Sequence, residues 1–111
     1  MNYTVEISQQ ADEDLREIYC YIAFKLRAPE NAVGQVDRLE ERLMSLAQMP
    51  RRFKRYDREP WHSRELRQMP VDNFIVFYIP VDVGRKVTVL RIMYAGRDID
   101  SELNSRIDGV V

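Results

Sequence analysis

The chain has 111 residues, of which 45% are hydrophobic and 32% charged, with a formal net charge of -1. This length supports one compact domain, and the composition excludes a disordered, fibrous or membrane-spanning chain. A single cysteine, Cys20, excludes an internal disulfide, and with the single histidine, His62, it argues against structural zinc. We therefore expect one cytoplasmic domain over residues 1–111, without a metal, another cofactor or a membrane partner.

The first half of the chain predicts a short strand and two helices. Residues 3–7 alternate between apolar and polar, which is typical of a half-buried strand, and Ser8 is a good N-cap for a following helix. The apolar stripe of that helix is Ala11, Leu15, Ile18, Tyr19, Ile22 and Leu26. Pro29 suits the first turn of a second helix, which Pro50 brings to an end. Its stripe is Ala32, Val36, Leu39, Leu43 and Leu46, and the short link predicts an antiparallel helical hairpin.

The charge is unevenly distributed along the chain. Residues 51–67 carry seven Lys/Arg against three Asp/Glu, whereas residues 1–50 carry five against nine. A basic connector of this kind creates a positive potential that attracts phosphate groups or an acidic peptide. The alternative interpretation is a solvated surface loop, which charge runs usually form.

The second half of the chain predicts three strands and a short helix. The strands are expected over Arg64–Met69, Phe74–Ile79 and Val87–Tyr94. Residues 70–73 supply turn chemistry, and residues 80–86 a hairpin loop. The middle strand is continuously apolar, which is typical of a strand buried on both faces. The final helix is indicated by the spacing of Ile99, Leu103 and Ile107.

The order β-α-α-β-β-β predicts an α+β fold. Short links favour pairing of consecutive strands, so the last three strands should form an antiparallel meander. We expect an antiparallel sheet with the helical hairpin packed on one face, because that arrangement buries both apolar stripes. The first strand must join this sheet, beside the last strand or next to another strand of the meander.

An ordered set of motifs along the chain resembles a known family. The motifs are Ala11-x-x-Asp14-Leu15-x-x-Ile18-x-x-Tyr21-Ile22, Pro29-x-x-Ala32, Leu46-x-x-x-Pro50, Pro70-Val71-Asp72-Asn73-Phe74, Val76-Phe77-Tyr78 and Tyr94-Ala95-Gly96-Arg97-Asp98. Over about residues 3–98 the chain resembles the RelE/ParE superfamily of toxins from bacterial type II toxin–antitoxin modules, often called plasmid stabilisation proteins. The resemblance implies a cytoplasmic toxin in a hetero-oligomer with a cognate antitoxin, through which alone it reaches operator DNA.

The resemblance implies one of two activities. RelE-like members are metal-independent endoribonucleases that cleave mRNA on the ribosome, whereas ParE-like members act on DNA gyrase without being enzymes. Metal-free RNA cleavage needs a base, an acid and cations around the phosphate. Compared with RelE-like members, Ile75 replaces an arginine, and Leu66 and Gln68 lie in or near the places of two lysines. No aromatic residue or histidine follows Tyr94.

These differences favour growth inhibition through DNA gyrase, by a protein that is not an enzyme. A ribosome-dependent mRNA endonuclease is the second hypothesis. The third is a degenerate toxin that keeps only antitoxin binding and transcriptional co-repression.

Four side chains are predicted to bind the target: Arg64, Arg67, Arg97 and Trp61. Guanidinium groups suit phosphate or carboxylate, and Trp61 could stack on a base or anchor a partner. With His62, the three arginines are also the catalytic candidates if the chain is a nuclease. The alternatives are edge-strand charges, an ion pair for Arg97, an ordinary surface position for His62, and closure of the open end of the core for Trp61.

Four apolar side chains fall off the buried stripes of the helices: Tyr21, Phe24, Val33 and Met44. At about 100° per residue they face away from the sheet and could form one patch. Antitoxins of this family lay an amphipathic segment over the helices, so these residues are the predicted antitoxin-binding surface. Isolated surface hydrophobes are the alternative.

Overall fold

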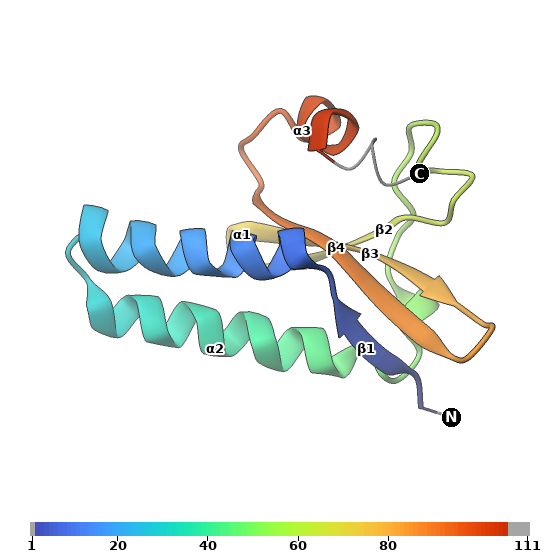
Figure 1. Ribbon diagram of the computed structural model, residues 1–111, viewed down its shortest axis with the longest axis horizontal. Coiled ribbons are helices and arrows are strands. Elements are labelled where there is room, and N and C mark those ends of the chain that lie inside the picture. Colours follow the sequence, from blue (N-terminus) through green and yellow to red (C-terminus); the bar gives the residue numbers. More distant parts are fainter. Residues whose placement is uncertain (1, 107–111) are drawn as a thin grey trace.

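The computed structural model describes residues 2–106 and has the expected α+β order, shown in Figure 1. Its elements are β1 (Thr4–Ile7), α1 (Gln9–Cys20), a π-helical turn (Tyr21–Lys25), α2 (Pro29–Ser45), a 3₁₀ turn (Pro50–Arg52), β2 (Arg67–Val71), β3 (Phe74–Val81), β4 (Lys86–Tyr94) and α3 (Ile99–Arg106). The predicted final helix is therefore present as α3, while Ile107 lies outside the described residues.

The four strands form one mixed sheet in the order β1-β4-β3-β2. β2, β3 and β4 are the predicted antiparallel meander, and β1 lies beside the last strand as one of the two expected placements. β1 nevertheless runs parallel to β4, with Thr4 opposite Lys86 and Ile7 opposite Val89. No tight turn links these two strands, so nothing forces an antiparallel pairing.

The boundaries of β2 and of both turns differ from the prediction. β2 begins at Arg67 rather than Arg64, and it continues through Pro70 to Val71, opposite Phe74. Only Asp72 and Asn73 form the turn, with Asp72 at a left-handed φ of 54°. Pro70 is tolerated because β2 is an edge strand and needs no donor on its outer side. In the same way β3 extends to Val81, which shortens the second hairpin loop to residues 82–85.

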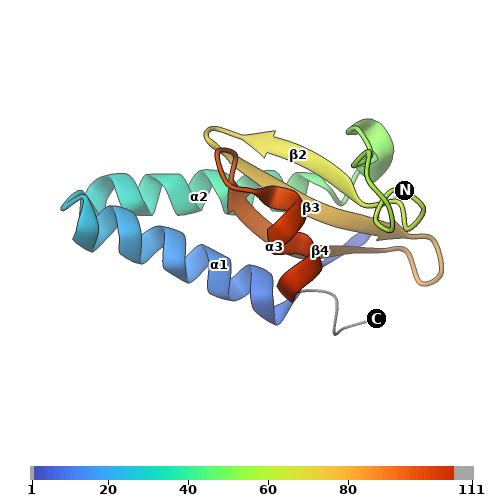
Figure 2. The same cartoon turned by 90° about the horizontal axis from the view of Figure 1, so that it is seen from above.

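The helical hairpin covers one face of the sheet and α3 the other (Figures 1 and 2). The larger core lies under the hairpin and consists of Ala11, Leu15, Leu39, Leu43, Leu46, Met69, Val71, Val76, Tyr78, Val87, Val89 and Ile92. The smaller core lies under α3 and consists of Tyr56, Trp61, Leu66, Phe77, Met93 and Leu103. The expected packing of the hairpin on one face is thus confirmed, and the connector and α3 close the other face.

The first helix begins as predicted and ends differently. Ser8 caps it by accepting a hydrogen bond from the Ala11 amide (3.0 Å). Its last turn is π-helical, with the Leu26 amide donating to the Tyr21 carbonyl five residues back (3.0 Å). The extra residue in this turn rotates Leu26 off the buried stripe, and Leu26 is 55% exposed. The prediction that Leu26 faces the core is therefore wrong.

A buried ion pair joins α1 to β4. Arg91 is fully buried, and its Nε and Nη2 donate to the Asp14 carboxylate at 2.7 and 3.0 Å. The same carboxylate accepts from the amide of Ile92 at 2.9 Å. β1 pairs only with residues 86–89 of β4, so this amide has no strand partner, and Asp14 supplies one. Asp14 thus neutralises a buried cation and also accepts a hydrogen bond from a backbone amide at the edge of the sheet.

Candidate functional site

A groove of about 620 Å³ opens between the end of the helical hairpin and the sheet. We call it the helix–sheet groove, and its main lining residues are Tyr21, Ile22, Leu26, Phe74, Tyr94 and Arg97. The π-helical turn places Tyr21 and Leu26 along one wall, and the paired ends of β3 and β4 form the other. Most of these side chains are apolar, so the groove suits an amphipathic segment of a partner.

The walls of the groove contain exposed aromatic and apolar side chains. Tyr94 is 53% exposed and lies edge-on to Phe74, with ring centroids 6.1 Å apart. Gly96 allows this placement, because a Cβ at that position would lie 2.6 Å from the Tyr94 ring. The apolar surface is therefore held in place by the local backbone.

All four side chains predicted to bind an antitoxin are exposed by half or more: Tyr21, Phe24, Val33 and Met44. Tyr21 lines the helix–sheet groove, whereas the other three do not. Val33 and Met44 lie about three turns apart on α2. Their exposure agrees with the prediction, and their role in binding stays a prediction.

Arg97 is the predicted target residue that the structure leaves most accessible. It follows β4, lines the groove, and is 46% exposed. Its Nη1 lies 3.5 Å from an oxygen of Glu102 on α3, so the expected ion pair with a neighbouring carboxylate is present but long. A competing anion from a partner could replace such a half-exposed contact at small cost.

Arg64 lies outside the predicted strand, whereas Trp61 takes its alternative role, closure of the core. Arg64 lies in the turn before β2, so the prediction that it belongs to the same strand as Arg67 is wrong. Its guanidinium group lies 5.1 Å from the centre of the Trp61 ring. Trp61 is 2% exposed and donates from Nε1 to Asn104 of α3 at 2.9 Å. Trp61 thus closes the core, and contact with a target would require α3 to move.

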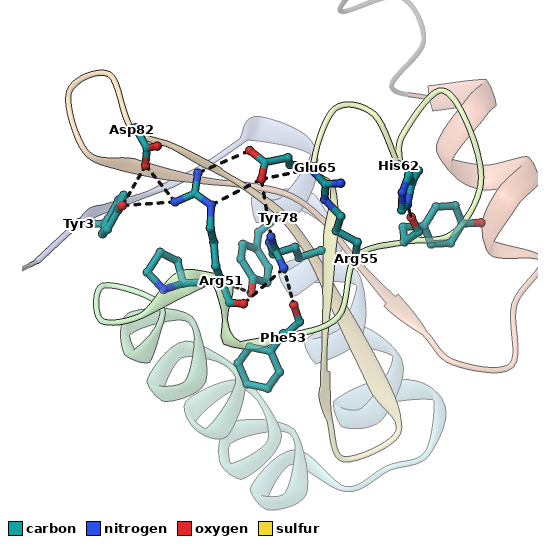
Figure 3. A network of polar contacts seen from close by, with 11 residues as sticks. Tyr3, Arg51, Phe53, Arg55, His62, Glu65, Tyr78 and Asp82 are labelled. Atoms are coloured by element: carbon teal, nitrogen blue, oxygen red, sulfur yellow. Dashed lines mark hydrogen bonds and ion pairs between the residues drawn. The ribbon is translucent and has the colours of Figure 1, made fainter.

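His62 belongs to the connector and not to a cluster of arginines. Its Nδ1 lies 2.9 Å from the carbonyl oxygen of Tyr56. Figure 3 shows it well apart from Arg51 and Glu65. The structure therefore does not bring His62 together with Arg67 as a catalytic pair.

The sheet face under α3 is apolar. Leu66, Phe77 and Met93 are fully or almost fully buried there, and Ile75 packs against them. Leu103 of α3 lies over this face, and Tyr56 donates to Asp100 of α3 at 3.1 Å. This face of the sheet therefore presents hydrocarbon side chains to α3.

Arg67 belongs to an arginine cluster that the sequence did not predict. We define the arginine cluster as Arg51, Arg55 and Arg67 around the carboxylate of Glu65 (Figure 3). Arg67 donates to the carbonyl oxygens of Phe53 (2.8 Å) and Arg51 (3.3 Å), which fixes the connector against β2. The only sequence signal for this cluster was the density of arginines in residues 51–67.

Electrostatics stabilise the charged forms in the arginine cluster. A hydrogen bond from Arg51 lowers the pKa of Glu65. The pKa of Arg51 is raised, mainly by its hydrogen bond to Glu65 and secondly by its hydrogen bond to Asp82. Asp82 accepts from Arg51 Nη1 and from the Tyr3 hydroxyl, both at 2.9 Å. These two hydrogen bonds lower the pKa of Asp82, and the bond from Tyr3 has the larger effect. The cluster thus ties β1, the connector and the β3–β4 hairpin together.

Among residues 2–106, no group of three or more His, Cys, Asp or Glu side chains is placed to hold a metal ion. No helix in the same part of the chain is long and apolar enough to cross a bilayer. The polar chemistry that the structure describes is that of arginines and carboxylates.

The class of protein follows from a comparison with known families. Residues 5–99 match the model of the ParE toxin family of the type II toxin–antitoxin system parDE, and the chain belongs to this family. No curated protein matches the chain significantly. Solved structures with the same fold include members of both branches of the RelE/ParE superfamily.

A chromosomal ParDE toxin–antitoxin system from P. aeruginosa contains a chain with 22% identity and a TM-score of 0.68, covering 83% of this chain and 95% of that one. The RelBE2 toxin–antitoxin complex of Mycobacterium tuberculosis has 20% identity and a TM-score of 0.62, covering 85% and 92%. A doubly substituted E. coli RelE toxin in the free state has 15% identity and a TM-score of 0.67, covering 100% and 99%. At these identities the likeness shows the fold alone.

Proposed function

We propose that this toxin inhibits DNA gyrase in a ParE-like way and does not cleave RNA. The observation that carries the proposal is the apolar sheet face under α3, where Ile75 packs against Phe77 and Met93. Metal-free cleavage of RNA requires cations around the phosphate and a proton donor and acceptor. The description of the matched family, the toxin of parDE, supports the same branch.

Gyrase supercoiling with purified toxin is the direct test. We expect supercoiling to be inhibited, and the same preparation to leave mRNA intact in a translation extract. Arg97→Ala should weaken inhibition, because Arg97 is the accessible target candidate. Arg16→Ala is the matched control, since Arg16 is another exposed arginine that pairs with a carboxylate, and it is distant from Arg97 in the sequence. The proposal would be contradicted if the toxin arrests growth in cells but leaves gyrase supercoiling normal at saturating concentration in vitro.

The alternative endonuclease is favoured by one observation. Arg97, one of the catalytic candidates if the chain is a nuclease, is half exposed beside the helix–sheet groove. Position-specific cleavage of mRNA on ribosomes, abolished by Arg97→Ala, would support that alternative. The third hypothesis, a degenerate toxin, predicts normal growth when the chain is expressed without an antitoxin.

We also propose that a cognate antitoxin neutralises the toxin by laying an amphipathic segment in the helix–sheet groove. Tyr21, Leu26 and Tyr94 each expose more than half of their surface there, although large apolar side chains gain by burial. Arg97 at the same groove suits a carboxylate of the partner. ParDE and RelBE neighbours were solved as toxin–antitoxin systems, which supports a partner of this kind.

Affinity for the antitoxin encoded beside the toxin tests the groove. Leu26→Asp should weaken binding by about tenfold or more, because it places a charge in the apolar contact. Val83→Asp is the matched control, since Val83 is 86% exposed in the β3–β4 loop and does not line the groove. Asp substitutions at Phe24, Val33 and Met44 test the outer helical surface, because these residues do not line the groove. They should weaken binding only if the antitoxin also contacts that surface. Equal affinities for Leu26→Asp and wild type would reject the groove.

A further inference from the structure

The three guanidinium groups of the arginine cluster are spaced too widely for one carboxylate to contact all of them closely. The nearest nitrogens of Arg51, Arg55 and Arg67 lie 3.5, 3.3 and 3.6 Å from Glu65 Oε1. Carboxylates that are held closely by one arginine lie at shorter distances, 2.8 Å for Arg38–Asp72 and 2.7 Å for Arg91–Asp14. Glu65 thus lies among three guanidinium groups without close contact to any of them.

The cluster also has buried donors that Glu65 does not use. The Nε atoms of Arg55 and Arg67 are buried and have no hydrogen-bond partner among the described residues. A buried donor without an acceptor costs free energy, and each guanidinium group has five N–H donors while a carboxylate has only two oxygens. The cluster therefore has more donors than its own carboxylate can satisfy.

Two of the three arginines are held in place independently of Glu65. Arg51 is bound by Asp82 (2.9 Å), and Arg67 by the carbonyl oxygen of Phe53 (2.8 Å). The Glu65 side chain is one-third exposed and can turn into solvent without opening the core. Its backbone has a φ of 62°, a left-handed conformation that is uncommon for Glu and is enriched at functional sites. Two preorganised guanidinium groups, those of Arg51 and Arg67, thus lie beside a replaceable anion.

We propose that the arginine cluster is a binding site for a phosphate group, which Glu65 occupies when no ligand is bound. A phosphate group carries more negative charge than a carboxylate and offers at least three acceptor oxygens in a tetrahedral arrangement. It can contact three guanidinium groups at once and accept from the unused Nε donors. The site is separate from the helix–sheet groove, and it does not depend on the identity of the toxin's target.

The site is tested by titrating the purified chain with inorganic phosphate. Calorimetry measures the affinity, and amide shifts in NMR spectra locate the binding site. Glu65→Gln removes the competing charge and keeps the shape of the side chain. We expect it to bind phosphate at least about tenfold more tightly than wild type. Adding Arg55→Gln to this variant should abolish the gain. Asp72→Asn is the matched control, because it removes a carboxylate from Arg38 outside the cluster and should leave phosphate affinity unchanged.

The source of the phosphate is distinguished by competition. If a short single-stranded oligonucleotide displaces inorganic phosphate from Glu65→Gln, the ligand is a nucleic-acid backbone; if it does not, the ligand is a free phosphate. Either result retains the site. Equal phosphate affinity in wild type and Glu65→Gln, or shifts of amides outside the cluster only, would overturn it. Should Glu65→Gln fail to fold, Glu65→Asp withdraws the carboxylate by one methylene and should give a smaller gain.

Discussion

Asp14 shows how one side chain can determine several local features. It neutralises Arg91 and also binds the Ile92 amide, so it compensates for the short reach of β1 along β4. Ser8 acts in a similar way at the same edge, because its hydroxyl donates to the Leu90 carbonyl at 2.9 Å. These two residues protect the far half of β4, which would otherwise be an unpaired sheet edge.

Removing the carboxylate of Asp14 should destabilise the protein strongly. Asp14→Ala leaves Arg91 buried without its counter-charge, so the free energy of unfolding should fall by about 3–5 kcal/mol. Urea denaturation followed by circular dichroism measures this change. Asp12→Ala, which removes an exposed i,i+4 partner of Arg16, should change it by less than about 1 kcal/mol. A loss for Asp14→Ala as small as that of the control would show that Arg91 finds another partner.

At the scale of elements, the turn at the end of α1 and the helix α3 determine which surfaces are open. The π-helical turn moves Leu26 off the core stripe and makes it part of the groove wall. α3 covers the apolar face that would otherwise be open to solvent, and Leu103 is its one fully buried side chain among residues 99–104. The exposure of Leu26 departs from simple helical periodicity, whereas the burial of Leu103 follows it.

Shortening Leu103 should loosen α3 without unfolding the sheet. Leu103→Ala shortens the fully buried side chain that α3 packs in the same core as Trp61 and Met93, and a buried Leu→Ala substitution costs about 2–5 kcal/mol. Hydrogen exchange should show lost protection at residues 102–104, with β3 and β4 still protected. Trp61 is the only tryptophan, so its fluorescence should report the exposure directly. Ser101→Ala, at an exposed position of the same helix, should change neither signal.

At the scale of the whole molecule, ionisable groups at three sites limit stability at low pH. The pKa values of Glu65, Asp72, Asp82 and Glu59 are lowered, mainly by hydrogen bonds to Arg51, Arg38, Tyr3 and Ser63 respectively. A lowered folded pKa gives stability that is present above the unfolded value and lost as the pH falls through the folded value. The urea midpoint should therefore begin to fall near the ordinary carboxyl pKa of about 4 and continue to fall at lower pH. Glu65→Gln should reduce this fall, and an unchanged fall would contradict the assignment.

Buried tyrosines should limit stability at high pH. Burial raises the pKa of Tyr78 and of Tyr56 to about 12, from an ordinary value of 10.0. A raised folded pKa gives stability that is complete below pH 10 and lost as the pH rises towards 12. The thermal midpoint should fall over this range together with the appearance of phenolate absorbance. Tyr78→Phe should flatten the fall, although it also loses the hydrogen bond to the Pro50 carbonyl.

The fold was predictable because its signals are local. The N-cap Ser8, the stripe from Ala11 to Ile22, and the apolar run of β3 each identify an element from neighbouring residues. The start of β2 was misplaced because its register depends on pairing with β3, and Pro70 is admitted only because β2 is an edge strand. The parallel direction of β1 likewise depends on contacts distant in sequence.

The candidate sites were predictable only in part. Exposure of Tyr21 and Phe24 followed from helical periodicity, and Arg97 from its position after the last strand. The target-binding role predicted for Trp61 competed with closure of the core, and the connector folds back under α3 so that Trp61 closes the core, contacts Arg64 and donates to Asn104. No sequence signal indicates which arginines meet, because Arg51, Arg55 and Arg67 converge on Glu65 only after the connector has packed against β2.

The sequence by itself determined the order of elements, the apolar stripes and the family, since these depend on periodicity and motifs within short segments. The tertiary structure decided which charges are buried, which arginines share a carboxylate, and which apolar residues stay exposed. The physical reason is that burial and charge pairing depend on groups brought together from distant segments. The helix–sheet groove and the arginine cluster are both products of such contacts.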